Sequence, residues 1–193
     1  MVIDNLSLRL DASTSCLLVG DNGSGKSTIG RLFTGVLAPK SGEIKLFGDH
    51  IYGLKGSTRV RRALYLNQNI HLNFIKSSIR DEIKFSCKVA GREWPDARMI
   101  QKFDLPDLDT VPLDLTISES WRLLFLIGHI VSPDLLFIDE FPSVVHKQNM
   151  EHLSELMARR KHESQITVVA YQRDVSEAPF DLRFKLEGGR LVV

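Results

Sequence analysis

Short apolar runs alternate along this chain with longer segments in which apolar residues return every three to four positions. The runs at 15–19, 64–66, 135–138 and 166–170 have the length and composition of buried strands. Helical spacing follows the first run, at Ile29, Leu32, Phe33 and Val36, and it appears again at 150–157. Strands that alternate with amphipathic helices predict an α/β fold with a layered core.

The middle of the chain has a different pattern. The stretch 74–132 is richer in helical spacing than its flanks, so we expect a helical subdomain inserted into a core formed by 1–73 and 133–193. The most apolar segment is interrupted by His129, Pro133 and Asp134, and no segment is predicted to span a bilayer. We therefore expect one domain over 1–193.

Composition narrows the choice of partners. A formal net charge of +1 offers no bulk attraction to nucleic acid or anionic lipid, and no nucleic-acid partner is expected. The two cysteines, Cys16 and Cys87, are too few for a disulfide framework, so both are predicted to be buried packing residues in a reducing compartment.

A glycine-rich loop directly follows the first predicted strand. Its sequence, GDNGSGKST at 20–28, satisfies the phosphate-loop pattern G-x-x-x-x-G-K-[ST]. Glycines let backbone N–H groups close around phosphate oxygens, and the following helix adds a favourable dipole. Lys26 is predicted to neutralise the β- and γ-phosphates, Ser27 to bind Mg²⁺, and Thr28 to hydrogen-bond oxygen near the α-phosphate. The predicted nucleotide-binding residues are Asp21, Asn22, Gly23, Ser24, Gly25, Lys26, Ser27 and Thr28.

Two carboxylates end the predicted strand at 135–138. Asp139 is predicted to hold Mg²⁺, and Glu140 to polarise the water that attacks the γ-phosphate. Taken alone, the run could equally be a strand with an ordinary acidic turn. Its pairing with the glycine-rich loop favours a catalytic role for Glu140 and Lys26.

Segments around these motifs resemble the ABC ATPase family over nearly the whole chain. The resemblance is carried by LAPKSGEI at 37–44, the glycine turn at 47–49, ALYLNQN at 63–69 and the closing LEGGRL at 186–191. It implies a P-loop NTPase core with an inserted helical subdomain, ATP as the nucleotide, and ATP hydrolysis. It also assigns Gln68 to Mg²⁺ and γ-phosphate sensing and to contact with a membrane partner.

The resemblance further implies partners and a location. Two such domains would pair head to tail around two ATP molecules, with an identical or a different ATPase as the dimer partner. A separate membrane-spanning transporter subunit would be driven from the cytoplasmic face of the cell membrane. A weaker resemblance to energy-coupling-factor ATPases, at Gln68, Asn69 and 78–85, favours import of small molecules. Two alternatives remain: a non-transport ABC ATPase that acts as a nucleotide-gated clamp, and a regulatory ATP-binding subunit with little turnover.

The chain departs from the family at three places, which predicts slow turnover. LTISE at 115–119 stands where the family has L-S-G-G-Q, and Thr116 with Glu119 also fits a helix capping box, so ligand contact and capping both stay open. Tyr171 and Gln172 stand where the family has a switch histidine, and either could hydrogen-bond the γ-phosphate. The turn at 141–146 lacks the usual aspartate.

Overall fold

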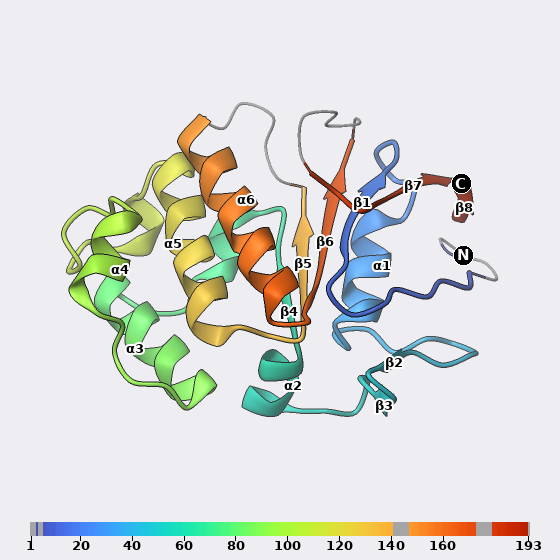
Figure 1. Cartoon of the computed structure of the whole chain (residues 1–193), viewed down its shortest axis with the longest axis horizontal. Coiled ribbons are helices and arrows are strands. Elements are labelled where there is room, and N and C mark those ends of the chain that lie inside the picture. Colours follow the sequence, from blue (N-terminus) through green and yellow to red (C-terminus); the bar gives the residue numbers. More distant parts are fainter. Residues whose placement is uncertain (1–2, 4–5, 141–146, 173–178, 193) are drawn as a thin grey trace. The chain divides into compact units, whose positions relative to one another are not determined.

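The computed structural model describes Ile3 and residues 6–140, 147–172 and 179–192 (Figure 1). The strands are β1 (Ser15–Val19), β2 (Lys45–Leu46), β3 (Asp49–His50), β4 (Ala63–Leu66), β5 (Leu135–Asp139), β6 (Ile166–Tyr171), β7 (Leu182–Glu187) and β8 (Arg190–Val192). The α-helices are α1 (Lys26–Phe33), α2 (Gly56–Arg62), α3 (Ile79–Ala90), α4 (Ala97–Lys102), α5 (Ile117–Val131) and α6 (Lys147–His162). Short 3₁₀ turns cover Ile70–Asn73 and Pro112–Asp114.

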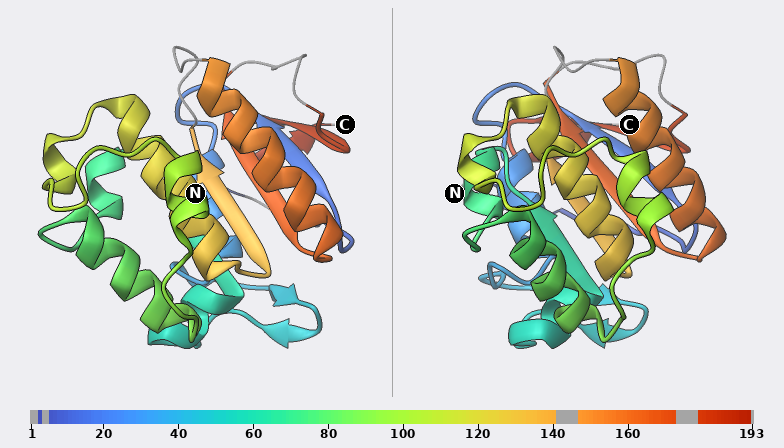
Figure 2. Two further views of the ribbon diagram at one scale, coloured as in Figure 1. Left: turned by 60° about the vertical axis from the view of Figure 1, so that its left-hand side comes forward. Right: turned by 90° about the vertical axis from the view of Figure 1, so that its left-hand side faces the viewer.

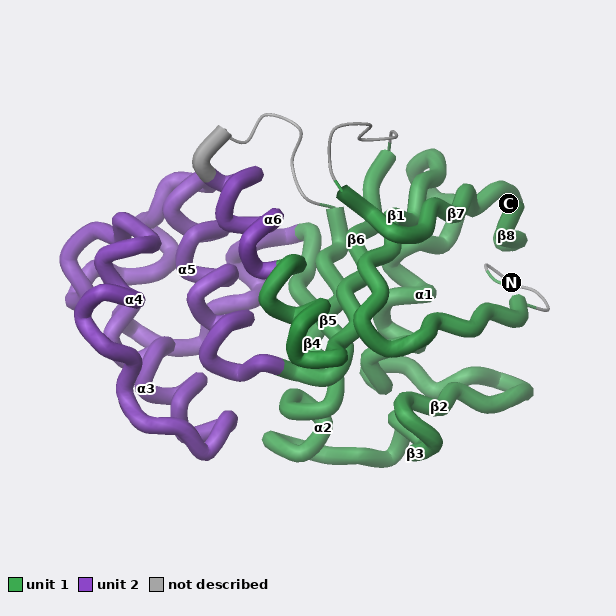
Figure 3. The backbone as a smooth tube through the Cα atoms, in the orientation of Figure 1, with its two compact units in different colours: residues 1–68, 133–141, 157–193 green, residues 69–132, 142–156 purple. Residues whose placement is uncertain are grey.

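The chain divides into two compact units (Figure 3). Unit 1 consists of 1–68, 133–141 and 157–193, and unit 2 of 69–132 and 142–156. Unit 2 thus takes in residues after the fifth strand that the sequence pattern placed in the core. The division of the chain into an ATPase core and an inserted subdomain stays a prediction.

Unit 1 is built on one six-stranded sheet with the order β4-β5-β6-β1-β7-β8. The first five strands run parallel, and β8 pairs antiparallel with β7 at the edge. All four strands predicted from apolar runs are present, which confirms the α/β fold. The central strands are buried along their length because helices cover a parallel sheet on both faces.

Helices lie on opposite faces of this sheet, and the strand register shows it (Figures 1 and 2). Phe137 of β5 lies against α1, because a Cβ added at Gly30 of that helix would come within 2.5 Å of the Phe137 ring. Thr167 of β6 is in register with Leu136, the residue before Phe137 in β5. Because side chains alternate along a strand, Thr167 lies on the face of the sheet opposite to Phe137 and α1. Arg160, in the unit 1 part of α6, donates a 2.8 Å hydrogen bond to the Thr167 hydroxyl.

Gly30 sets how closely α1 approaches the sheet. A Cβ at this position would also lie 2.7 Å from the Tyr65 ring in β4, so only glycine fits between the helix and the two aromatic rings. The helix ends sooner than its apolar spacing predicted. Thr34 caps it and Gly35 turns the chain at a φ of 68°, so Val36 lies beyond the helix and is exposed.

Unit 2 consists mainly of helices. The helices α3 and α5 pack together, and every residue of α5 from Ser120 to Val131 is buried.

Cys87 of α3 and Cys16 of β1 are both buried, as the sequence analysis predicted, and burial raises the pKa of the Cys16 thiol to about 12. None of the helices in the described ranges is long and apolar enough to cross a membrane.

Asp181, directly before β7, connects the start of β1 to the start of β7, its neighbour in the sheet. Its carboxylate accepts hydrogen bonds from the Ser15 backbone N–H at 2.8 Å and from the Ser15 hydroxyl at 2.7 Å, and it forms an ion pair with Lys161. The Lys161 ammonium, with the Ser15 donors, lowers the Asp181 pKa to about 2. The charged form of this carboxylate is therefore the one that the fold stabilises.

We expect Asp181→Asn to destabilise the protein at neutral pH and to matter less in acid. The Asp181 pKa is lower in the folded chain than its unfolded value near 3.9, so its stabilisation is complete above about pH 5 and is lost as the pH falls towards 2. Urea unfolding of wild type and variant between pH 7 and pH 2.5 measures the difference. Asp11→Asn, at an exposed ion pair, is the control with little expected effect at any pH. A constant difference across the range would contradict the assignment.

Candidate functional site

The loop between β1 and α1 has a backbone that only glycine tolerates at its key positions. Gly23 and Gly25 have φ angles of 80° and 111°, in the left-handed region that side chains rarely adopt. A Cβ at Gly20 would lie 2.6 Å from the Leu186 carbonyl oxygen and 2.7 Å from the Ser24 hydroxyl. The predicted glycine-rich loop is therefore a tight turn that opens directly into the N-terminus of α1.

Lys26 turns its ammonium group into this loop. The side chain is buried, and Nζ donates hydrogen bonds to the carbonyl oxygens of Gly20 at 2.6 Å and Asp21 at 2.9 Å. The Ser24 hydroxyl is buried beside it and has no hydrogen-bond partner within the described chain. A buried cation, an unused hydroxyl and the first backbone N–H groups of α1 together form donors that suit a phosphate group.

The carboxyl ends of three strands meet beside this loop. Val19 of β1 is in register with Tyr171 of β6, and Asp139 of β5 is in register with Ala170. The Gly20 N–H donates to the Tyr171 carbonyl oxygen at 3.1 Å, and the Glu140 N–H donates to Ala170 at 3.1 Å. The glycine-rich loop and the acidic pair, far apart in sequence, therefore lie at one edge of one sheet.

The two carboxylates differ in their surroundings. Asp139 is 2% exposed and accepts a hydrogen bond from the Tyr65 hydroxyl of β4. Glu140 is the first residue after β5 and has a φ of 62°, a left-handed conformation that costs roughly 1–2 kcal/mol for a residue with a side chain. Strained backbone of this kind is concentrated at functional sites.

Gln172 links the acidic pair to the glycine-rich loop. Its side-chain amide donates to Asn22 Oδ1 at 2.8 Å and also to Glu140 Oε1. Of the two residues that the sequence offered in place of a switch histidine, this is the one that contacts both motifs. Its contact with a γ-phosphate stays a prediction.

The remaining predicted site residues are Ser27, Thr28, Gln68 and the turn at 141–146. Ser27 and Thr28 lie in the first turn of α1. Gln68 is exposed two residues beyond β4, and it does not join the cluster by a hydrogen bond within the described chain. The turn at 141–146 lies outside the described residues.

The oxygen groups present suit Mg²⁺ only in combination with a ligand. The described residues contain no group of three or more His, Cys, Asp or Glu side chains that could hold a metal. Mg²⁺ is commonly bound by one or two protein oxygens together with substrate phosphates. Asp139 and Ser27 fit that pattern, because each offers an oxygen next to the loop that carries the phosphate donors.

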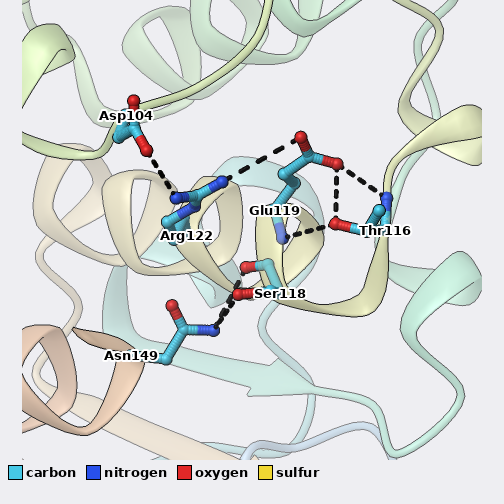
Figure 4. A network of polar contacts seen from close by, with 6 residues as sticks. All are labelled: Asp104, Thr116, Ser118, Glu119, Arg122 and Asn149. Carbon is cyan, nitrogen blue, oxygen red and sulfur yellow. Dashed lines mark hydrogen bonds and ion pairs between the residues drawn. The ribbon is translucent and has the colours of Figure 1, made fainter. Parts of the chain in front are cut away.

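In unit 2, the segment at 115–119, which the sequence analysis compared with L-S-G-G-Q, leads into helix α5 (Figure 4). Thr116 is the N-cap of α5: its hydroxyl accepts from the Glu119 N–H at 3.3 Å, and its own N–H donates to Glu119 Oε2 at 2.9 Å. This reciprocal pair is a capping box, so the capping interpretation is confirmed. Ligand contact by Thr116 stays a prediction.

Contacts that the sequence analysis missed fix the start of α5 (Figure 4). Asn149 donates to the backbone oxygen of Ser118 at 3.2 Å and to its hydroxyl at 3.1 Å. Arg122 forms an ion pair with Asp104 at 2.9 Å. No local pattern signals these contacts or the one between Tyr65 and Asp139, since the Asn149 and Tyr65 partners lie 31 and 74 residues away in sequence.

We expect Thr116→Ala to lower the free energy of unfolding by about 1 kcal/mol, because the first turn of α5 loses its cap. Thr116→Ser keeps the hydroxyl and should retain most of the stability. Urea unfolding followed by circular dichroism distinguishes the three proteins. Equal stability of the alanine variant and wild type would show that the cap contributes nothing.

The sequence of this chain is similar to a known protein family and to individual proteins of known role. A family model described as ABC transporter matches residues 3–143. Curated relatives include the energy-coupling factor transporter ATP-binding protein EcfA1 of Geobacillus kaustophilus, 28% identical over 184 residues, and that of Bacillus subtilis, 28% identical over 185 residues. Each alignment covers 91% of this chain and 65% of the relative, so the chain spans less than two thirds of their length.

Solved structures share the fold. An ATP-binding subunit of an ABC transporter has a TM-score of 0.86 at 19% identity, with 100% of this chain and 82% of that chain covered. A dimeric ATP-binding cassette bound to ADP and Pi has a TM-score of 0.83 at 15% identity, with 100% and 89% covered. For cbiO1 from Clostridium perfringens, part of an ABC transporter complex, the TM-score is 0.75 at 18% identity, with 100% and 80% covered.

Proposed function

Because this chain belongs to the ABC transporter family, we propose that it is an ATP-binding subunit that hydrolyses ATP and powers transport through a separate membrane-spanning partner. One observation carries the proposal: the Lys26 loop, Asp139 and Glu140 lie at the same edge of the unit 1 sheet. A phosphate in the loop would therefore have the acidic pair beside it.

The glycine-rich loop would bind the triphosphate. Residues 21–28 supply backbone N–H groups, the Ser24 hydroxyl and the Lys26 ammonium, which neutralises charge on the β- and γ-phosphates. Ser27, Asp139 and Gln68 would hold Mg²⁺, which when bound withdraws negative charge from the phosphate oxygens. Thr28 would hydrogen-bond oxygen near the α-phosphate.

Glu140 would act on the attacking water. Its carboxylate lies next to the loop, where it can accept a proton as the water oxygen bonds to the γ-phosphorus and the β–γ bridge breaks. Gln172 would hold this carboxylate in place, because its amide spans Glu140 and Asn22. It would thereby take over part of the work of a switch histidine.

The names of the relatives support transport over a non-transport clamp. Both EcfA1 proteins are ATP-binding proteins of energy-coupling factor transporters, and we propose the same class of work for this chain. It would act at the cytoplasmic face of a membrane, paired with a second ATPase of identical or different sequence. A nucleotide-gated clamp on nucleic acid has no comparable support.

We expect Glu140→Gln to lower ATP turnover at least 100-fold in the assembled complex while ATP binding is retained, because the water loses its proton acceptor. A coupled phosphate-release assay and binding of a fluorescent ATP analogue measure the two quantities. Glu93→Gln, at an exposed position in unit 2, is the matched control. Unchanged turnover would assign catalysis to another chain of the complex.

Gln172→Ala should lower kcat about tenfold and change the Kd for ATP much less, since its hydrogen bond to Glu140 concerns the chemical step and its bond to Asn22 reaches only one side chain of the loop. Gln172→His keeps an N–H donor and is expected to preserve more of the turnover. Steady-state kinetics with a parallel binding titration separates kcat from affinity. Equal kcat for the alanine variant and wild type would remove Gln172 from the site.

A further inference from the structure

Tyr65 makes a contact that the proposed function does not use. Its hydroxyl, on β4, donates a hydrogen bond to Oδ2 of Asp139 at the end of the neighbouring strand β5. Asp139 is 2% exposed, and a buried carboxylate is costly unless hydrogen bonds compensate for the lost water. The tyrosine therefore supplies a partner that an apolar strand residue at position 65 could not.

Packing holds the Tyr65 ring in one place. The ring stacks on Phe137 with centroids 5.8 Å apart and an interplanar angle of 26°. The backbone of α1 closes over both rings at Gly30, where any Cβ would collide with them. The position of the Tyr65 hydroxyl is thus fixed by β4, β5 and α1. Because the Asp139 carboxylate accepts its hydrogen bond, the carboxylate is oriented by the same packing.

The Asp139 oxygen that accepts the Tyr65 hydrogen bond is Oδ2, so this oxygen is engaged by the protein itself.

The Tyr65 ring also touches the helix that carries Ser27. A Cβ at Gly30, three residues after Ser27, would lie 2.7 Å from the Tyr65 ring. Tyr65 therefore contacts α1 through its ring and Asp139 of β5 through its hydroxyl. These are the two elements from which the proposed Mg²⁺ oxygens come.

We propose that Tyr65 is a positioning residue for the divalent cation: by engaging Oδ2 of Asp139, it fixes the carboxylate so that the other oxygen is presented to the ion beside Ser27. This inference rests on the proposed function, because it concerns how the same site holds Mg²⁺. Partners in the second layer of a metal site commonly determine ligand orientation, and their removal costs 10–100-fold in metal affinity.

The test is a Mg²⁺ titration of nucleotide binding that requires no turnover. A fluorescent, non-hydrolysable ATP analogue is bound to wild type and to Tyr65→Phe, which keeps the ring and its stacking but removes the hydroxyl. We expect the Mg²⁺ concentration for half-maximal tightening to rise about tenfold, with unchanged affinity for the analogue in EDTA. Tyr52→Phe, a half-buried tyrosine away from Asp139, is the matched control and should follow wild type.

A double-mutant cycle assigns the effect to the pair. In an Asp139→Asn background, Tyr65→Phe should cause no further change in the Mg²⁺ requirement, because the carboxylate that it positions is gone. Thermal unfolding of each variant separates loss of positioning from loss of fold. Mg²⁺ curves that coincide for Tyr65→Phe and wild type would overturn the role of Tyr65 alone. A wild-type protein whose nucleotide binding is indifferent to Mg²⁺ would overturn the proposed function, and this inference with it.

Discussion

The backbone register of β1, β5 and β6 is the constraint on which the rest of unit 1 depends. Parallel strands end at the same edge of a sheet, and here the pairing of Val19 with Tyr171 and of Asp139 with Ala170 brings the glycine-rich loop, the acidic pair and Gln172 together. A slip of one residue in β5 would turn Asp139 to the opposite face. The close fit of Phe137 and Tyr65 against Gly30 of α1 opposes any such slip.

Close approach of backbone follows from that register and is made possible by glycine. Gly30 lets α1 lie directly on the Tyr65 and Phe137 rings of β4 and β5. Gly20 lets the loop pass beside Leu186 of β7. Glu140 has a left-handed conformation directly after β5, where its N–H is hydrogen-bonded to the Ala170 oxygen of β6.

Two places where the sequence predicted departures from the family pattern have different surroundings. Thr116 and Glu119 cap α5, a role that needs no nucleotide. Gln172 contacts both Glu140 and Asn22, and so it links the acidic pair to the glycine-rich loop. Hydrogen bonds within the chain therefore give each position a structural role of its own.

By itself, the sequence determined the α/β class, four strands of the sheet, the glycine-rich loop and the acidic pair, and it offered the capping box as one of two interpretations of Thr116. These are encoded by residue types close together in the chain, in apolar runs, fixed spacings and helix-start signals. It overextended α1 to Val36, because apolar spacing does not register a turn that Gly35 imposes.

Only the tertiary structure decided the contacts between distant segments. Tyr65 meets Asp139 across 74 residues, Asn149 meets Ser118 across 31, and Gln172 reaches Asn22 across 150. A tyrosine in a strand is interpreted from sequence as a packing residue, and Gln172 is predicted only as a candidate contact to the γ-phosphate. The contacts of Tyr65 and Gln172 arise from strand order and register. Both depend on the assembly of the whole sheet, so neither can be predicted from the local sequence pattern.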